Sequence, residues 1–166
     1  MFVIAAVTLI SLFHPGPRTP PQVTHRLYGL AGWRISVDHD TFTGAVSCSL
    51  TAKQMRFKSD TLIFHIGPGV EATHAVFRLD GGAPRAVSTV FREDEAHGFF
   101  PQRGWIDNPA GGDVALPANQ LKGVKRLWIR ASPANQPRYF NVSRFNDALA
   151  GAKAAGCSDK AFGTAS

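Results

Sequence analysis

Apolar and polar residues alternate along much of this chain, which is the pattern of strands that bury one face. Residues 33–37 read WRISV, so three apolar side chains lie on one side and Arg34 and Ser36 on the other. Glycine, proline and aspartate separate the alternating segments and favour tight turns between strands. We expect strands at residues 33–37, 43–50, 55–57, 61–66, 73–79, 85–91, 113–116, 124–131 and 138–142.

This series of short strands predicts a mainly β fold, an antiparallel β-sandwich or meander in a single domain with a C-terminal helix. The segments 61–66 and 73–79 are joined by GPGVEA, and we expect them to pair as a hairpin. The segments 124–131 and 138–142 are joined by SPANQP and are expected to form a second, closing hairpin.

The helix is expected near the C-terminus. Ser143 suits the N-cap position because its hydroxyl can accept a bond from a free backbone N–H. Phe145, Leu149 and Ala152 recur at the spacing of one helix face. Gly156 is expected to end the helix, since glycine readily adopts the left-handed conformation of a helix end.

The N-terminus has the character of an export segment. Residues 1–13 are apolar and uncharged, too short to span a bilayer, which needs about 20 residues, but as long as the hydrophobic region of a signal peptide. Residues 14–22 contain four prolines and favour an extended spacer. A buried N-terminal strand is the alternative. The predicted organisation is an export segment with a Pro-rich spacer at 1–22, one β-rich domain at 23–157 and a flexible tail at 158–166.

The composition is that of a folded, basic domain. Of the 166 residues, 44% are hydrophobic and 18% charged, which excludes a disordered chain and a coiled coil. The 18 Lys and Arg outnumber the 12 Asp and Glu, giving a formal net charge of +6. The charge stays positive if residues 1–22 are removed, because they contain only Arg18. This balance permits an anionic partner without requiring one.

Cys48 and Cys157 are the two cysteines of the chain. They are too few for an all-cysteine zinc site or a dense disulfide scaffold, and they form no CxxC motif. In an exported chain we expect them to pair, closing a loop of about 100 residues worth roughly 4 to 5 kcal/mol in the chain-entropy model. The bridge would tie the C-terminal helix to the strand at 43–50. In a cytosolic chain they would be two separate buried thiols.

The closing hairpin is a candidate binding surface. One face is expected to be apolar, with Leu127, Ile129, Phe140 and Val142. The other face is expected to present Arg126, Trp128, Arg130, Tyr139 and Asn141. An aromatic pair flanked by arginines can stack on a ring and bind an anionic group. Alternatively, Trp128 packs beneath another strand or loop. No nucleic-acid motif accompanies the patch, so no specific nucleic acid is expected as partner.

A histidine pair is a candidate metal site. If the hairpin 61–66/73–79 forms, His65 lies opposite His74, close enough to share a metal or a proton. The third ligand would come from His39, His97, Asp38 or Asp40. The alternative is two histidines on the less buried face of the sheet, with no ligand.

The segment 93–112 shows no periodicity and contains His97 and Trp105. Long loops of this kind are often functional. It is expected either to form a lid or partner contact, or to cover a face of a sheet.

Enzyme signatures are absent from the sequence. It contains no G-x-S-x-G, H-E-x-x-H, P-loop or G-x-G-x-x-G opening a helix. We therefore expect no cofactor and favour a protein that is not an enzyme. A small hydrolytic or metal-dependent enzyme remains the alternative, using His65 and His74 with Asp38, Asp40 or Asp107.

Five segments together resemble the invasion-associated locus B family of exported alphaproteobacterial proteins. They are GWRISVD (32–38), AVSCSL (45–50), RLDGGAPRAV (78–87), LPANQLKGVKRLWIRA (116–131) and YFNVSRFNDALAGAKAAGC (139–157). The resemblance implies a compact β-sandwich-like domain in the periplasm or at the cell surface. It implies no catalytic residues.

The sequence thus predicts an exported bacterial domain, periplasmic or secreted and without a transmembrane span in the mature chain. We expect it to act as a non-enzymatic binding or envelope-associated module, with an anionic envelope component or another protein as partner. A second alternative is an anion- or glycan-binding protein that uses the face of Arg126, Trp128 and Arg130.

Overall fold

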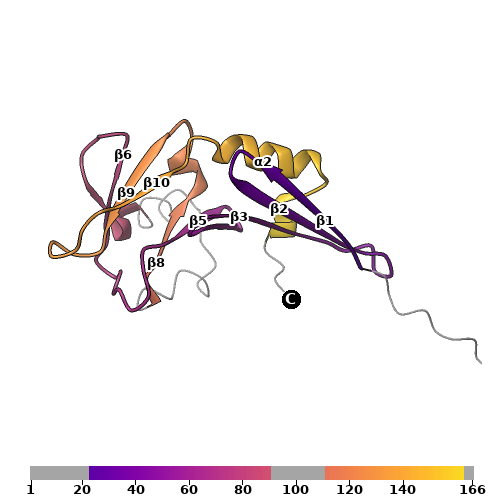
Figure 1. Cartoon of the computed structure of the whole chain (residues 1–166), viewed down its shortest axis with the longest axis horizontal. Coiled ribbons are helices and arrows are strands. Elements are labelled where there is room, and N and C mark those ends of the chain that lie inside the picture. Colours follow the sequence, from indigo (N-terminus) through magenta and orange to yellow (C-terminus); the bar gives the residue numbers. More distant parts are fainter. Residues whose placement is uncertain (1–22, 91–110, 163–166) are drawn as a thin grey trace, which may run out of the picture.

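The computed structural model describes residues 23–90 and 111–162, which form two antiparallel sheets and a C-terminal helix (Figure 1). The larger sheet has the strand order β1-β2-β3-β4-β5-β8 and the smaller one the order β10-β9-β6-β7. The predicted mainly β fold with a C-terminal helix is confirmed. The six-stranded sheet comprises β1 (Val23–Leu30), β2 (Trp33–Asp40), β3 (Val46–Ala52), β4 (Met55–Lys58), β5 (Thr61–His65) and β8 (Asp113–Pro117). The four-stranded sheet comprises β6 (Val76–Leu79), β7 (Arg85–Ala86), β9 (Arg126–Arg130) and β10 (Arg138–Asn141).

The six-stranded sheet begins as a meander in which each strand from β1 to β5 pairs with the next. Ala31 and Gly32 join β1 to β2, and Ser59 and Asp60 join β4 to β5. All four residues have positive φ, from 42° to 87°. Two-residue turns of this conformation match the twist of the strands that they connect. Short local turns therefore set the register of these two hairpins.

The predicted hairpin between 61–66 and 73–79 is wrong. Strand β5 pairs with β4 and β8, whereas β6 pairs with β7 and β9 in the other sheet. The tight Ser59–Asp60 turn brings β4 to one edge of β5, and β8 occupies the other edge along its whole length. The ladder even continues beyond β5, where the Ile66 N–H donates to the Gly112 carbonyl at 2.8 Å.

Three local predictions also need correction. The strand expected at 85–91 is limited to β7, and residues 87–90 are helical. Ser143 does not cap the helix: the N-cap residue is Arg144, and the Ser143 hydroxyl donates to Asn141 Oδ1 at 2.7 Å instead. The tail expected to be flexible from residue 158 forms the 3-10 helix η4 (Asp159–Phe162), because Phe162 buries its ring in the core.

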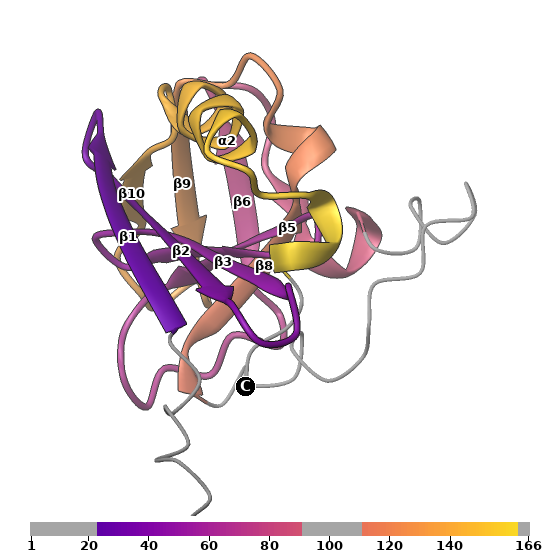
Figure 2. The same ribbon diagram turned by 90° about the vertical axis from the view of Figure 1, so that its right-hand side faces the viewer.

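Helix α2 (Phe145–Ala154) lies over the end of the six-stranded sheet formed by β1, β2 and β3 (Figure 2). The Phe145 ring packs 5.5 Å from that of Trp33 and 5.3 Å from that of Phe57, measured between centroids. The Phe57 ring also meets Phe162 of η4 at 5.1 Å. These four buried aromatic side chains join both C-terminal helices to the sheet, and burial of such rings is a large source of stability.

The close approach of α2 to the sheet depends on Gly151. A Cβ atom at this position would lie 3.0 Å from Leu30 Cδ2 and 3.7 Å from Ile35 Cδ1. A larger side chain here would require the Leu30 side chain to shift by a few tenths of an ångström.

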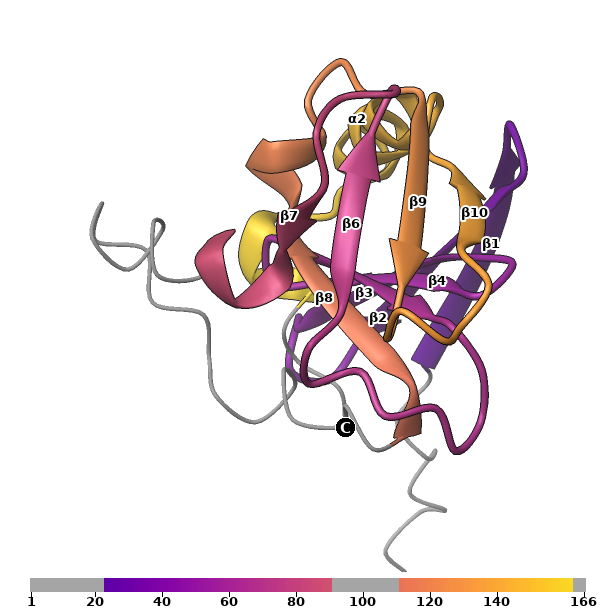
Figure 3. The ribbon, with the colours of Figure 1, turned by 90° about the vertical axis from the view of Figure 1, so that its left-hand side faces the viewer.

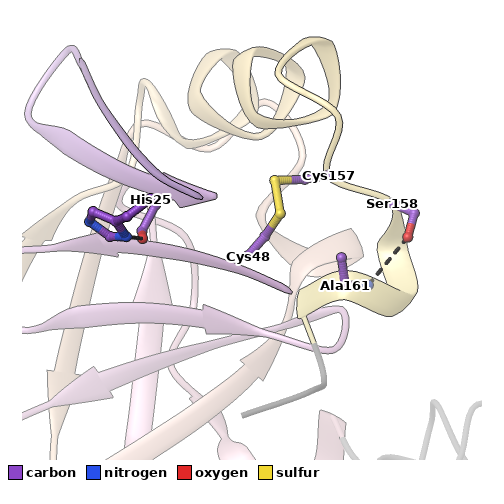
Figure 4. The surroundings of a disulfide bond; sticks show 6 residues. His25, Cys48, Cys157, Ser158 and Ala161 are labelled. Atoms are coloured by element: carbon purple, nitrogen blue, oxygen red, sulfur yellow. Dashed lines mark hydrogen bonds between the residues drawn. A yellow bond between two sulfur atoms is a disulfide. The ribbon is translucent and has the colours of Figure 1, made fainter. Parts of the chain in front are cut away.

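The predicted disulfide between Cys48 and Cys157 is confirmed. It joins β3 to the third residue after the end of α2, with a Cα–Cα distance of 6.0 Å (Figure 4). Gly156, at φ 103°, ends the helix as predicted. Its N–H donates to the Lys153 carbonyl, and the Cys157 N–H donates to the Ala152 carbonyl, each at 3.0 Å. This pair of bonds is the Schellman motif, and it turns Cys157 towards β3.

Removal of the bridge should cost stability without unfolding the chain. The double variant Cys48→Ala/Cys157→Ala should lose about 4 kcal/mol of unfolding free energy, because its unfolded state is no longer restricted by a loop of about 100 residues. Urea unfolding of the oxidised wild type, the reduced wild type and the variant measures this. Equal urea midpoints for the oxidised and bridge-free forms would contradict it.

Candidate functional site

The outer face of the four-stranded sheet carries the candidate site. Figure 3 shows β7, β6, β9 and β10 side by side, with the six-stranded sheet behind them. Along β9, Leu127 and Ile129 are fully buried. Arg126, Trp128 and Arg130 alternate with them and are exposed or half-buried. Phe140 and Val142 are buried with the two β9 residues, so the two faces predicted for the closing hairpin are confirmed.

Trp128 is the centre of a row that crosses three strands. Its neighbours in the ladder are Arg78 of β6 and Tyr139 of β10. The rings of Trp128 and Tyr139 are 5.4 Å apart and tilted by 53°. The guanidinium carbons of Arg78 and Arg126 lie 5.2 and 5.7 Å from the centre of the Trp128 ring. Both distances fall within the range of cation–π attraction. Two positively charged guanidinium groups therefore lie next to the indole ring.

These arginines keep their charge for a ligand. Among residues 23–90 and 111–162, no carboxylate lies in ion-pair contact with Arg78, Arg126 or Arg130. A guanidinium carries five N–H donors and a permanent charge, and it binds carboxylate, sulfate or phosphate groups with two parallel hydrogen bonds. The row is therefore an aromatic platform with positive charge that takes part in no ion pair among the described residues.

A hollow of about 170 Å³ lies next to Trp128 on this face. It is lined by Val76, Phe77, Arg78, Pro84, Trp128, Arg130 and Pro137. Two of its walls are proline rings, which have little freedom to move.

The Asp80 carboxylate fixes the beginning of β9. It accepts hydrogen bonds from the backbone N–H groups of Lys125, at 3.1 Å, and Arg126, at 2.8 Å. The N–H of Lys125 and then that of Arg126 hold the pKa of Asp80 below its ordinary value. The positive charges of Arg126 and Lys125 lower this pKa further. The turn that follows β6 thus sets the position of β9 and of Trp128.

The structure does not bring His65 and His74 together, because they belong to segments that do not pair. His65 ends β5, and its Nδ1 lies 3.0 Å from Asp113 Oδ1, while Arg56 Nη2 lies 2.6 Å from Asp113 Oδ2. His74 is exposed in the turn before β6. Within the part of the chain that the structure describes, no group of three His, Cys, Asp or Glu gathers at a distance suited to a metal ion.

The other acidic candidates have local partners. Asp38 is hydrogen-bonded to His25 on the neighbouring strand β1. Asp40 binds the Thr43 hydroxyl at 2.7 Å and the Phe42 N–H at 2.8 Å. These bonds, led by that of the Thr43 hydroxyl, lower the pKa of Asp40. His97, Trp105 and Asp107 lie outside the described residues.

Arg78 and Asp113 were missed by sequence reasoning. Arg78 does alternate with the apolar residues Phe77 and Leu79, which is a signal that it faces outward. Its place beside Trp128 depends on the pairing of β6 with β9, which no local pattern reveals. Asp113 reaches His65 only because β8 pairs with β5.

Comparison of the chain with protein-family models, curated proteins and solved structures gives no match. The candidate site therefore rests on its geometry. In the described ranges, no helix combines the length and the apolar character of a membrane span.

The role of Asp80 can be tested with Asp80→Asn. Near neutral pH this variant should unfold at a lower urea concentration than the wild type, because the two N–H donors lose a charged acceptor. The pKa of Asp80 is lowered in the folded state. Its contribution to the free energy of unfolding is therefore complete above the ordinary pKa of 3.8, and it is lost as the pH falls through the pKa of the folded state. The difference in urea midpoint between Asp80→Asn and the wild type should therefore disappear at acidic pH. Asp60→Asn, in another turn, is the control, and a difference that does not depend on pH would contradict the assignment.

Proposed function

We propose that this chain is an exported, non-enzymatic binding domain that captures an anionic ligand on the outer face of its four-stranded sheet. The observation that carries the proposal is the row of Arg78, Trp128 and Tyr139, where two guanidinium groups surround an indole without a carboxylate partner among the described residues. Exposed aromatic and arginine side chains on a rigid sheet are typical of surfaces that bind partners.

A binding role has more support than a catalytic one. Two histidines are oriented by carboxylates, His65 through Nδ1 by Asp113 and His25 through Nδ1 by Asp38. The Ser36 hydroxyl lies 3.4 Å from the same Nδ1 of His25, so one ring nitrogen faces both the carboxylate and the hydroxyl. In the described ranges, no hydrogen bond joins the other ring nitrogen of either histidine to a serine, threonine or cysteine. Nucleophilic catalysis needs such a pair in hydrogen-bond reach. Arg56 also neutralises the Asp113 carboxylate, which favours a structural ion-pair network on this sheet.

Export is supported by three features of the chain. The apolar residues 1–13 have the length of a signal-peptide hydrophobic region. The disulfide is of a kind that persists in oxidising compartments. The resemblance of the segments from Trp33 to Cys157 to the invasion-associated locus B family supports the same proposal, with the periplasm or the surface of a bacterium as the location. The ligand would then be an anionic component of the envelope or of a surface that the cell meets.

Heparin is a suitable first probe, because it is a dense polyanion. The variant Arg78→Ala/Arg126→Ala should bind it at least about tenfold more weakly than the wild type, since the loss of even one charge-assisted hydrogen bond, worth about 1.5 kcal/mol, corresponds to about tenfold in affinity. Binding of the wild type should also weaken as salt is added. Titration calorimetry of the oxidised protein measures both effects.

The control Arg26→Ala/Arg144→Ala removes the same charge from exposed positions on β1 and before α2. It should bind heparin within about twofold of the wild type if attraction is local to the site. Equal weakening in both double variants, or binding that ignores salt, would mean that the four-stranded face is not the site.

A further inference from the structure

The hollow beside Trp128 has the size and chemistry of a site for a single ring. Its volume is about 170 Å³, whereas pockets for whole drug-sized ligands hold about 300–1,000 Å³. Val76, Pro84 and Pro137 supply apolar walls, and Trp128 supplies an aromatic one. A flat or puckered ring with an apolar face therefore fits better than an extended, fully polar chain.

The polar side chains of the hollow are donors only. Arg78 and Arg130 are the two polar side chains among its lining residues, and a guanidinium has no acceptor. In the ladder, Arg78 lies opposite Trp128 and Arg130 opposite Val76, so the two cations stand on adjacent strands at opposite sides of the hollow. A ligand held here must itself supply acceptors with negative charge. Neutral and cationic ligands would gain no charge-assisted hydrogen bond from the two arginines.

The surface around the hollow is too small for a nucleic-acid groove. Arg126 and Arg130 are four residues apart on β9, which is about 13 Å, and β6 to β10 spans about 10 Å. Grooves for single-stranded nucleic acid track about 4 to 16 nucleotides with a line of basic and stacking residues. One or two sugar units match the area of the arginine patch better.

We infer that this hollow holds one pyranose ring of an acidic saccharide, with its apolar face against the lining that includes Trp128, Pro84 and Pro137 and its carboxylate, sulfate or phosphate group near Arg78 and Arg130. The inference rests on the proposed function, since it specifies the ligand of the same face. Pyranose rings carry an apolar C–H face and acceptor-rich edges, and an acidic substituent adds the charge that the two arginines require.

A comparison of three probes separates ring from charge. Short oligogalacturonate carries rings and carboxylates, its methyl ester carries rings without charge, and oligoglutamate of equal charge carries carboxylates without rings. Oligogalacturonate should bind about fivefold to tenfold more tightly than oligoglutamate, which is the scale of one ring contact on an aromatic side chain. The methyl ester should bind at least about tenfold more weakly than oligogalacturonate.

Variants assign the effect to the hollow. Trp128→Ala should abolish the preference for oligogalacturonate over oligoglutamate, and Trp128→Phe, which retains a ring, should keep most of it. Because Trp128 is half-buried, Arg78→Gln at an exposed position gives a second test that does not threaten folding. It should weaken oligogalacturonate while leaving the methyl ester unchanged.

Equal affinity for oligogalacturonate and oligoglutamate would overturn the saccharide inference but leave an anion-binding face in place. Tighter binding of single-stranded DNA than of oligogalacturonate would overturn it in favour of nucleic acid. If neither these probes nor heparin bind, the proposed function itself fails.

Discussion

The disulfide between Cys48 and Cys157 is the constraint on which the rest of the arrangement depends. It fixes the end of α2 to β3, and the beginning of the same helix carries Phe145 into the aromatic cluster with Trp33 and Phe57. The helix is thus held at both ends, once by a covalent bond and once by packing. Gly151 then lets it lie close to β1 and β2.

The same constraint reaches the candidate site through a short path. The Phe145 N–H donates to the Val142 carbonyl, and the Val142 N–H donates to the Lys125 carbonyl, each at 3.0 Å. The backbone N–H of Lys125 in turn donates a hydrogen bond to the Asp80 carboxylate at the beginning of β9. A helix locked onto the six-stranded sheet therefore holds the position of the hairpin that presents Trp128 and Tyr139. A rigid platform of this kind loses little conformational entropy when it binds a ligand.

Local patterns in the sequence were sufficient for most of the strands, for the two faces of the closing hairpin and for the helix end at Gly156, whereas β1 was missed and the strand at 85–91 was expected too long. In each case the determining residues are close in sequence, so periodicity or a single glycine carries the information. The disulfide could be predicted because the two cysteines of the chain allow one intramolecular pairing. The pairing of β5 with β8 and of β6 with β9 could not be predicted from the sequence. Several strands have the same alternation of apolar and polar residues, and which of them pairs at a given edge depends on the whole fold.

The errors at the candidate site follow from this limit. His65 faces Asp113 rather than His74 because the partner of β5 is distant in sequence. Arg78 joins Trp128 for the same reason. Ser143 has the right chemistry for a helix cap, but the helix begins one residue later, with Arg144 at the N-cap, and the Ser143 hydroxyl donates to Asn141 Oδ1. Phe162 lies in the tail that was expected to be flexible, yet its ring is buried and packs η4 against Phe57.

The most direct test of this account is the intact mass of the protein recovered from the periplasm or medium of the cells that make it, before and after reduction and alkylation. The account predicts a chain shortened at its N-terminus that takes up two alkyl groups only after reduction. A full-length chain with two thiols that react without reduction would contradict it, because the helix would then be held by packing alone and the case for export would lose its chemical basis.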